Sequence, residues 1–403
     1  MSGLPDINAE TYPFDVVQQL LNQAAFFNLY SRAAGCDSIR DRDGATIGFG
    51  LVEDLHRFAI DVSTPTDGAA LTASNRIGER LARFEQRWVF IRPAYAARPG
   101  AEPPPCPFDP SSIQRFVMLD AEFTLEGGDR FRGFGTGRTG PSPCGRRDEV
   151  LVYAVGTILE GDGRFAGRDG TYTYCGSLSR DGFRGSLLLR VADPDERFTT
   201  ESLSACASTR PLDEPDVSYV FLAGQKESRT SKTGYVRGRG DDIVGLDVEQ
   251  QLRLLSTDCA EREQGRIHCA SSLGPVVGKM TARIGFNLLN PGAPGTQVAP
   301  IPFSSYNRYT ITDNDGTILG SFDADGNEGR TFTMSLAGAP GQRALRFGGF
   351  GPLLNGRGCF EGIAGQMTDN SVVGIAPHAI ATSYVLRIFD RSGAYRSDPA
   401  GAR

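Results

Sequence analysis

Residues 156–170 read GTILEGDGRFAGRDG, and residues 351–365 read GPLLNGRGCFEGIAG. Aligned without a gap, the two stretches agree at seven of fifteen positions, namely five glycines, one leucine and one phenylalanine. A glycine-rich chain would give about one such match by chance. Beyond the glycines, Leu189–Asp193 (LRVAD) corresponds to Leu386–Asp390 (LRIFD). An internal duplication of this kind indicates a repeated structural unit, which decides the fold.

The duplication divides the chain into five parts. The repeated units cover 87–197 and 282–391, a size that suits one small domain each. We expect an N-terminal helical segment over 1–86, a linker or insertion over 198–281 that could hold the opening strands of the second unit, and a mobile tail over 392–403.

Each unit has the pattern of an antiparallel β structure. Short runs rich in Val, Phe, Tyr and Thr alternate with glycine-rich turns such as Glu126–Asp129, which favour hairpins. Many short, evenly spaced strands predict a closed barrel or a sandwich per unit. Apolar residues at helical spacing predict helices over Phe14–Ala34 and Ala73–Trp88, and a further helix around Asp247–Leu255.

Composition excludes several classes of protein. The chain of 403 residues is 39% hydrophobic and 22% charged, as in globular proteins, and its formal net charge of −6 gives no attraction to nucleic acid. It contains no apolar run of membrane-spanning length and no basic, apolar leader at its start, so we expect a cytoplasmic protein. Its eight cysteines show no CxxC and predict reduced thiols.

Metal and cofactor sites are not expected. The three histidines, His56, His268 and His378, show no metal-binding spacing, and no nucleotide-binding loop or GxSxG motif occurs. His378 is interpreted as a rim or turn residue rather than a proton-transfer group.

The second copy of the motif resembles a known family. Cys359–Met367 (CFEGIAGQM), followed by Pro377 and the strand Tyr384–Leu386, resembles the F-E-G-x-x-G-Q motif of allene oxide cyclases. The first copy, Gly163–Gly170, resembles the shorter G-x-F-x-G-x-x-G that dirigent proteins share, with Ala166 in place of the glutamate. The resemblance covers the C-terminal halves of both units.

The resemblance implies an eight-stranded antiparallel β-barrel in each unit. Such a barrel has a largely apolar cavity that folds a flexible hydrophobic substrate without a cofactor. In this family the phenylalanine of the motif, here Phe165 and Phe360, fills the barrel interior and would line a substrate. Glu361, at the family's glutamate position beside an apolar cavity, is a candidate acid or base, with anchoring of the turn backbone as the equal alternative.

Strand periodicity indicates further candidates. Thr136 and Arg138 share one strand face, where Arg138 could bind a carboxylate or enolate at a barrel mouth, although a bent strand with an exposed arginine explains the same pattern. Candidate catalytic residues Glu149 and Tyr153 also share a face.

Tyr172 and Tyr174 share another face and are candidate substrate-binding residues, with ordinary aromatic packing as the alternative. The equivalent arginines Arg190 and Arg387 lie within apolar strands and are expected to point to solvent.

The function that combines these features is a cyclase or isomerase of specialised metabolism. An apolar cavity would hold a polyene or polyketide-like substrate in a reactive geometry while polar groups polarise a carbonyl. Three alternatives remain: a non-catalytic dirigent-like or lipid-binding module, an epoxide-opening hydrolase or hydratase, and a purely structural tandem β protein whose barrel interiors are filled by side chains. The sequence leaves open which unit is active and whether the chain oligomerises.

Overall fold

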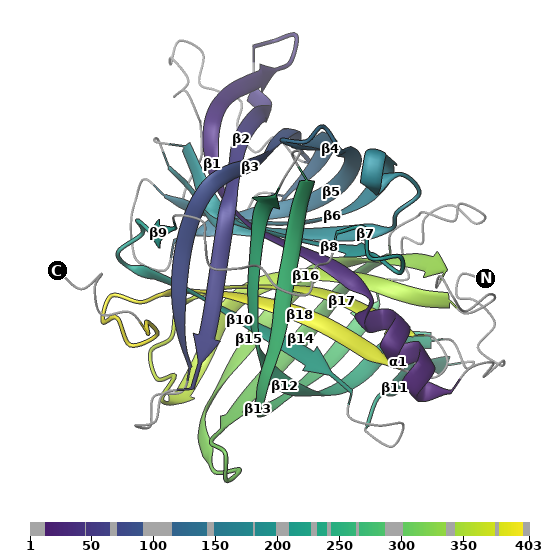
Figure 1. The fold of residues 1–403 in the computed structure, drawn as a ribbon, viewed down its shortest axis with the longest axis vertical. Coiled ribbons are helices and arrows are strands. Elements are labelled where there is room, and N and C mark those ends of the chain that lie inside the picture. Colours follow the sequence, from purple (N-terminus) through teal and green to yellow (C-terminus); the bar gives the residue numbers. More distant parts are fainter. Residues whose placement is uncertain are drawn as a thin grey trace.

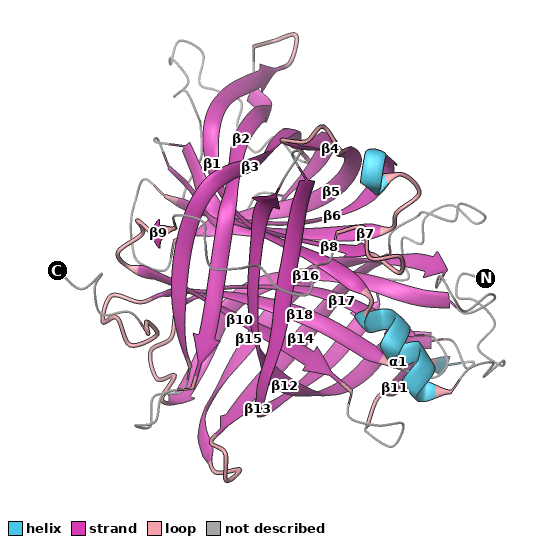
Figure 2. Cartoon of the chain, viewed as in Figure 1, coloured by secondary structure: helices cyan, strands magenta, loops and turns pink. Residues whose placement is uncertain are grey.

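The protein is mainly β, with long antiparallel strands and one α-helix among the described residues (Figures 1 and 2). The computed structural model describes residues 13–44, 46–64, 71–91, 115–142, 149–179, 182–198, 209–226, 232–239, 243–262, 266–286, 301–335, 343–374 and 379–397. Within them, no helix is both long and apolar enough to cross a membrane.

The first eight strands pair in a closed ring. After the helix α1 (Phe14–Asn22), each strand from β1 to β8 pairs antiparallel with the next, and β8 pairs back to β1. The members of this first ring are β1 (Ala24–Arg40), β2 (Thr46–Ser63), β3 (Thr72–Phe90), β4 (Arg115–Leu125), β5 (Arg130–Pro141), β6 (Val150–Asp162), β7 (Gly170–Ser179) and β8 (Gly182–Ala192). A short 3₁₀ turn, η1 (Gly163–Phe165), precedes β7.

The remaining long strands repeat this order of pairing. From β10 to β12 and onward to β18, each pairs with the next, and β18 pairs back to β10. The members of this second ring are β10 (Val217–Gln225), β12 (Ile243–Arg262), β13 (Arg266–Phe286), β14 (Ile301–Thr312), β15 (Ile318–Ser335), β16 (Arg343–Gly358), β17 (Gly365–Gly374) and β18 (Ile380–Phe389). The short strands β9 (Arg210–Pro211) and β11 (Gly234–Arg237) pair with β3 and β12.

Three predicted helices are strands for most of their length. α1 accounts for the first part of Phe14–Ala34, but β1 begins at Ala24; Ala73–Trp88 lies in β3, and Asp247–Leu255 in β12. Two register shifts in the β2–β3 pairing, between Ile77 and Ala82, explain the misleading pattern in β3. They change which alternate residues face inward, so the buried Ile77, Leu81 and Phe84 have helix-like spacing. β1, β2 and most of β3 thus precede residue 87, where the first unit was predicted to begin.

The repeated motif forms the same turn in both rings. Gly163 and Gly358 have φ values of 62° and 65°, which favour glycine. A Cβ at Gly161 or Gly356 would collide with the carbonyl oxygen of the motif phenylalanine. The turn directs Phe165 and Phe360 inward, and both are fully buried.

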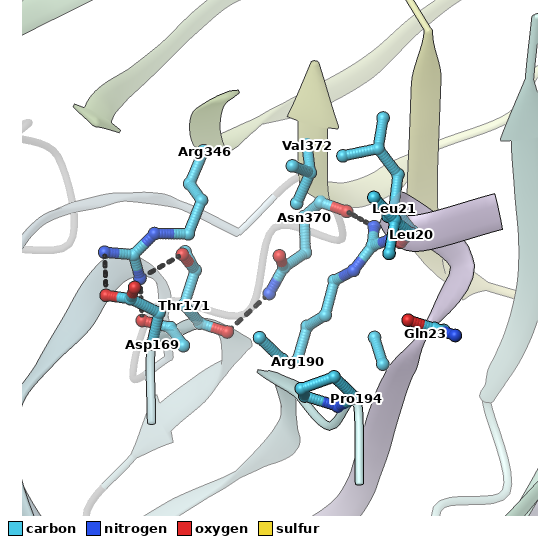
Figure 3. A pocket seen from close by; sticks show the side chains of 13 residues that line it. Leu20, Leu21, Gln23, Asp169, Thr171, Arg190, Pro194, Arg346, Asn370 and Val372 are labelled. Carbon is cyan, nitrogen blue, oxygen red and sulfur yellow. Dashed lines mark hydrogen bonds and ion pairs between the residues drawn. The ribbon is translucent and has the colours of Figure 1, made fainter. Parts of the chain in front are cut away.

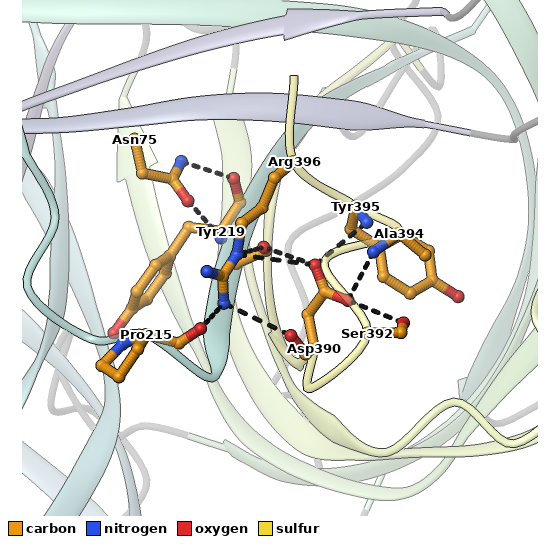
Figure 4. Close-up of polar contacts among 9 residues, drawn as sticks. Asn75, Pro215, Tyr219, Asp390, Ser392, Ala394, Tyr395 and Arg396 are labelled. Carbon is orange, nitrogen blue, oxygen red and sulfur yellow. Dashed lines mark hydrogen bonds and ion pairs between the residues drawn. The ribbon is translucent and has the colours of Figure 1, made fainter. Parts of the chain in front are cut away.

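An aspartate after the last strand of each ring fixes the chain that follows. Asp193 accepts hydrogen bonds from the backbone N–H of Arg197 and of Phe198, both 2.9 Å long. Asp390 accepts them from Ala394 at 2.8 Å and Tyr395 at 3.0 Å (Figure 4). The Phe198 ring then lies 4.9 Å from Phe165, and the Tyr395 ring 6.1 Å from Phe360.

Two further contacts tie this C-terminal segment to the rest of the chain. Arg396 donates to the carbonyl oxygen of Pro215, and Ala73 donates to the carbonyl oxygen of Tyr395 at 2.9 Å. Asn75 of β3 exchanges two hydrogen bonds with the backbone of Tyr219, of 2.8 and 2.7 Å (Figure 4). Residues 392–397, predicted to belong to a mobile tail, are therefore anchored.

The two rings pack on each other in two places, where β6 and β7 lie on β16 and β17 and where β2 lies on β12, the more extensive single contact (Figure 1). Gln366 of β17 donates to the carbonyl oxygen of Val152 at 3.0 Å, and Asn370 donates to that of Thr171 at 2.6 Å. Arg190 and Arg387, predicted to face solvent, are buried with exposures of 4% and 1%. That prediction is wrong because the neighbouring ring covers the outer faces of their strands.

One disulfide corrects the expectation of reduced thiols. Cys259 and Cys269 lie opposite each other on β12 and β13 and are bonded. Among the described residues, Cys175 and Cys359 are free thiols. Cys106, Cys144 and Cys206 lie outside the described residues, as do Pro377 and His378.

We expect Phe360→Ala to lower the free energy of unfolding by about 3–5 kcal/mol, because it empties a fully buried position that contacts Phe322 at 4.9 Å. Leu354→Ala, at a position that is 39% exposed, is the matched control and should cost under about 0.5 kcal/mol. Urea unfolding measures both. A loss of unfolding free energy below about 1 kcal/mol for Phe360→Ala would mean that the Phe360 side chain does not stabilise the core of the second ring.

Candidate functional site

The interior of the first ring is filled by aromatic side chains. Tyr172 and Tyr174 point into it, as their alternation predicts, and both are fully buried. The Tyr174 ring stacks on Phe183 at 4.3 Å, and Tyr172 packs edge-on against Phe84 at 5.7 Å. Phe165 lies within the same cluster. These contacts agree with the packing alternative for the two tyrosines.

One carboxyl group lies inside this aromatic core. Glu53 of β2 is fully buried and accepts hydrogen bonds from Ser31 at 2.5 Å, from Gln86 at 2.9 Å and from the Tyr174 hydroxyl. Burial raises the pKa of Glu53 to about 7, although its three hydrogen bonds oppose the shift. Donors therefore surround this carboxyl group, which holds Tyr174 in place.

The predicted cluster of Arg138, Tyr153 and Glu149 lies outside the ring interior. Tyr153 belongs to the outer face of β6 and stacks on Phe350 of the second ring at 5.7 Å. The Arg138 guanidinium lies over the aromatic rings of Tyr153 and Phe350, at 5.5 and 5.6 Å from their centroids. Arg138 therefore contributes to the contact between the two rings.

Thr136 and Glu149 also lie away from the ring interiors. Thr136 is half-buried on β5, on the same face as Arg138. Glu149 is buried just before β6 and lines a shallow pocket that also includes Arg184 and Glu214.

The predicted residues of the second unit separate as well. Phe360 lies in the interior of the second ring, whereas its neighbour Glu361 is exposed to solvent on the turn. The turn fixes Glu361 through its backbone, which donates to the carbonyl oxygen of Gly358 at 3.0 Å. The structure therefore places no carboxylate from this position beside the ring interior.

A pocket of about 20 Å³ lies inside the second ring. Its lining residues are every second residue of each strand, because alternate side chains of a strand in a closed ring point inward. Apolar walls come from Leu246, Phe303 and Phe347, and the polar members are Gln250, Asn307, Asp369, Ser371 and Tyr384. Such a combination of apolar walls and a few polar groups is typical of small-molecule sites.

Asp369 is the ionisable group of this pocket. Its side chain lies against Gly349 of β16, where any larger residue would collide with the carboxylate. The oxygen Oδ1 is buried and has no hydrogen-bond partner among the described residues. Burial raises the pKa of Asp369 from 3.8 to about 6, against the opposing effect of backbone N–H groups of Gly349 and Asp369.

Hydrogen-bonding side chains surround Asp369. The Tyr384 hydroxyl donates to Gln250 Oε1 at 3.1 Å, and Gln250 Nε2 donates to Thr382 at 3.0 Å. Asn307 Nδ2 donates to the Tyr309 hydroxyl at 3.4 Å, while Asn307 Oδ1 is buried without a partner in the described part of the chain. Burial and the nearby Asp369 charge raise the pKa of Tyr309 and of Tyr384, so both hydroxyls stay protonated.

This arrangement can perform acid–base chemistry without a metal or cofactor. A carboxyl group that titrates near neutrality can both accept and return a proton, and two unpartnered oxygens offer acceptors to a bound molecule. We name Asp369, Asn307, Gln250 and Tyr384 the interior pocket residues.

Sequence reasoning did not find the interior pocket. Asp369 occupies an inward position on β17, two residues after the buried Met367 and two before Ser371. The sequence signal that could have indicated Asp369 is a carboxylate at an inward position of an otherwise apolar strand, where charged residues are rare.

Comparison with protein-family models, with curated proteins and with solved structures finds no match for the chain.

The raised pKa of Asp369 gives a pH-dependent stability. The folded chain binds this proton more tightly than the unfolded chain, so the contribution of Asp369 to stability decreases as pH rises from about 4 to 6. At pH 8, Asp369→Asn should therefore exceed the wild type in free energy of unfolding by about 1–3 kcal/mol, and the excess should vanish near pH 3.5.

Urea unfolding between pH 3.5 and 8 measures this difference. Asp315→Asn, on an exposed turn, is the control and should show no such trend. A difference between Asp369→Asn and wild type that does not change with pH would contradict the assigned titration.

Proposed function

We propose that the chain is a cofactor-independent cyclase or isomerase for a hydrophobic small molecule such as a polyene or polyketide. In this proposal each ring is a barrel of the allene oxide cyclase type, and the two barrels stand in tandem. The second ring is the active one, and Asp369 is its catalytic acid and base. The observation that carries the proposal is the pocket inside the second ring with its unpartnered carboxylate oxygen.

The difference between the two rings supports this choice. The equivalent of Asp369 in the first ring is Tyr174, because Gly170 corresponds to Gly365 in the repeat. Tyr174 is occupied by its hydrogen bond to Glu53 and by stacking on Phe183. Asp369 instead lines a pocket, so chemistry is assigned to the second ring and a stabilising role to the first.

The proposed mechanism requires few groups. Apolar walls formed by Phe303, Phe347 and Leu246 would hold the hydrocarbon part of the substrate in a folded conformation. Asp369 would transfer a proton to or from the reacting centre, and the protonated Tyr384 hydroxyl would donate to a carbonyl oxygen. A pocket of about 20 Å³ accommodates a water molecule, so binding of a larger substrate requires the lining side chains to move.

Hydration is a second candidate function, favoured by the size of the same pocket. A water molecule fits beside Asp369 Oδ1, and a carboxylate that accepts a proton from water would activate it for epoxide opening.

Native mass spectrometry of the full chain from its producing cells, followed by incubation of the extracted ligand with fresh protein, tests the proposal. A product of unchanged mass but different structure supports the cyclase or isomerase. A product heavier by one water molecule transfers the assignment to the hydratase. A ligand that returns chemically unchanged from every incubation would overturn both and indicate a carrier.

Asp369→Asn should lower kcat by about 10²- to 10⁴-fold and leave ligand binding within a few-fold of wild type, because the amide keeps the shape and loses the proton transfer. Tyr384→Phe should lower kcat less, since it removes one hydrogen bond. Asp315→Asn on the exposed turn is the matched control. Full activity in Asp369→Asn would exclude this carboxylate from the reaction.

A further inference from the structure

Two equivalent arginines are buried where the rings meet, and only one of them has a carboxylate partner among the described residues. Arg190 on β8 and Arg387 on β18 occupy the same position of the repeated sequences LRVAD and LRIFD. Each lies over the aromatic residue paired with it on the neighbouring strand, Arg190 over Phe26 at 5.3 Å and Arg387 over Tyr219 at 6.0 Å.

Arg387 is neutralised within the chain. It forms a 3.0 Å ion pair with Glu214 and donates to Gln366 Oε1 at 3.0 Å and to the Tyr219 hydroxyl at 3.1 Å. Burial acts to lower the pKa of Arg387, but Tyr219 and Glu214 outweigh it and raise the pKa. A buried cation of this kind is stable because an anion compensates it.

The register of the strands places Leu21 where the second ring has Glu214. Val217 pairs with Phe389, and Ala24 pairs with Ala192, so the residues three positions earlier, Glu214 and Leu21, correspond. Arg190 donates to the carbonyl oxygens of Leu21 at 2.6 Å, Ala381 at 2.7 Å and Asn370 at 3.4 Å. The glutamate that compensates one arginine is thus replaced by a backbone carbonyl at the other.

A pocket of about 40 Å³ lies beside Arg190, between α1 and both rings (Figure 3). A second buried arginine, Arg346 of β16, lines it and donates to Thr157 at 3.0 Å and to Asp169 at 3.3 Å. Asp169 is the carboxylate of this pocket, and its side chain is 46% exposed at the rim. The lining thus holds two buried cations and one half-exposed anion.

Asn370 lies between the two arginines (Figure 3). Its Nδ2 donates to the carbonyl oxygen of Thr171 at 2.6 Å, which fixes the orientation of the amide. Its Oδ1 is buried and has no hydrogen-bond partner among the described residues. A buried acceptor of this kind is satisfied by a donor from a bound molecule.

We propose that this junction pocket, lined by Arg190, Arg346 and Asn370, binds a small oxyanion that also carries a hydroxyl group, such as hydrogen phosphate or a 2-hydroxycarboxylate. The anion supplies beside Arg190 the negative charge that Glu214 supplies beside Arg387. Its negative oxygens accept from the guanidinium groups, and its hydroxyl donates to Asn370 Oδ1.

The electrostatics of the pocket agree with this assignment. Burial lowers the pKa of Arg190 to about 10, which is the signature of a cation without a compensating charge. Burial also lowers the pKa of Arg346, and Asp169 offsets only part of that shift. A pocket of about 40 Å³ holds about two to four water-sized groups, so binding of phosphate or lactate requires the lining side chains to move.

Titration calorimetry and ³¹P NMR on the full chain at pH 7.5 test the proposal with four probes: phosphate, sulfate, lactate and propionate. Phosphate and lactate carry hydroxyl donors, whereas sulfate and propionate of the same charge type lack them. We expect saturable binding of phosphate, lactate or both, at least tenfold tighter than their matched anions. Phosphate alone would identify a phosphate site, and lactate alone a carboxylate site.

Asn370→Asp and Arg190→Met test which residues bind the anion. Asn370→Asp places a carboxylate in the pocket that compensates the arginines and repels a bound anion, so affinity should decrease at least tenfold while the fold is retained. Arg190→Met should abolish binding, and Asn370→Asp keeps the test informative if Arg190→Met does not fold. The control Asp315→Asn, on an exposed turn outside the pocket lining, should bind as the wild type does.

Three outcomes would overturn the proposal. The first is no saturable binding of any probe, and the second is that sulfate binds as tightly as phosphate and propionate as tightly as lactate. The third is unchanged anion binding in Asn370→Asp.

Discussion

Burial of the two rings against each other, β6 and β7 against β16 and β17 and β2 against β12, is the constraint on which this structure depends. Closed rings leave no unpaired strand edges, but they turn every second side chain outward. Where the rings meet, these outward side chains must find partners inside protein rather than in water. Gln366 and Asn370 do so by donating to carbonyl oxygens of the first ring, and Tyr153 does so by stacking on Phe350.

The sequence predicted the features of the fold that local chemistry controls. The duplicated glycines specify the same turn in both units, and in each unit the motif phenylalanine, Phe165 or Phe360, points inward. The hairpin turn at Glu126–Asp129 is formed as expected. The long N-terminal strands were misread because register shifts in β3 interrupt the alternation that identifies a strand. Neither the closing pair β1–β8 nor β10–β18 could be predicted, since these partners lie more than 150 residues apart.

The candidate site was predictable only as far as strand faces. Alternation placed Tyr172 and Tyr174 together and paired Arg138 with Thr136, and the structure has these pairs on common faces. It could not tell which face is enclosed by its own ring and which is covered by the other. For that reason Arg190 was assigned to solvent, and Asp369, the inward carboxyl group of the second ring, was overlooked.

The contact between the rings has a symmetry of its own. β7 lies on its repeat equivalent β17, β6 on β16 and β2 on β12, which is the pattern of a two-fold homodimer interface. The chain can therefore be described as a dimer whose subunits became covalently joined. Once joined, the two halves of the interface are free to diverge. Glu214 and Leu21, which occupy corresponding positions of the two repeats, show this divergence. Identical subunits would have the same residue at both positions, whereas a single chain can carry the carboxylate at only one of them.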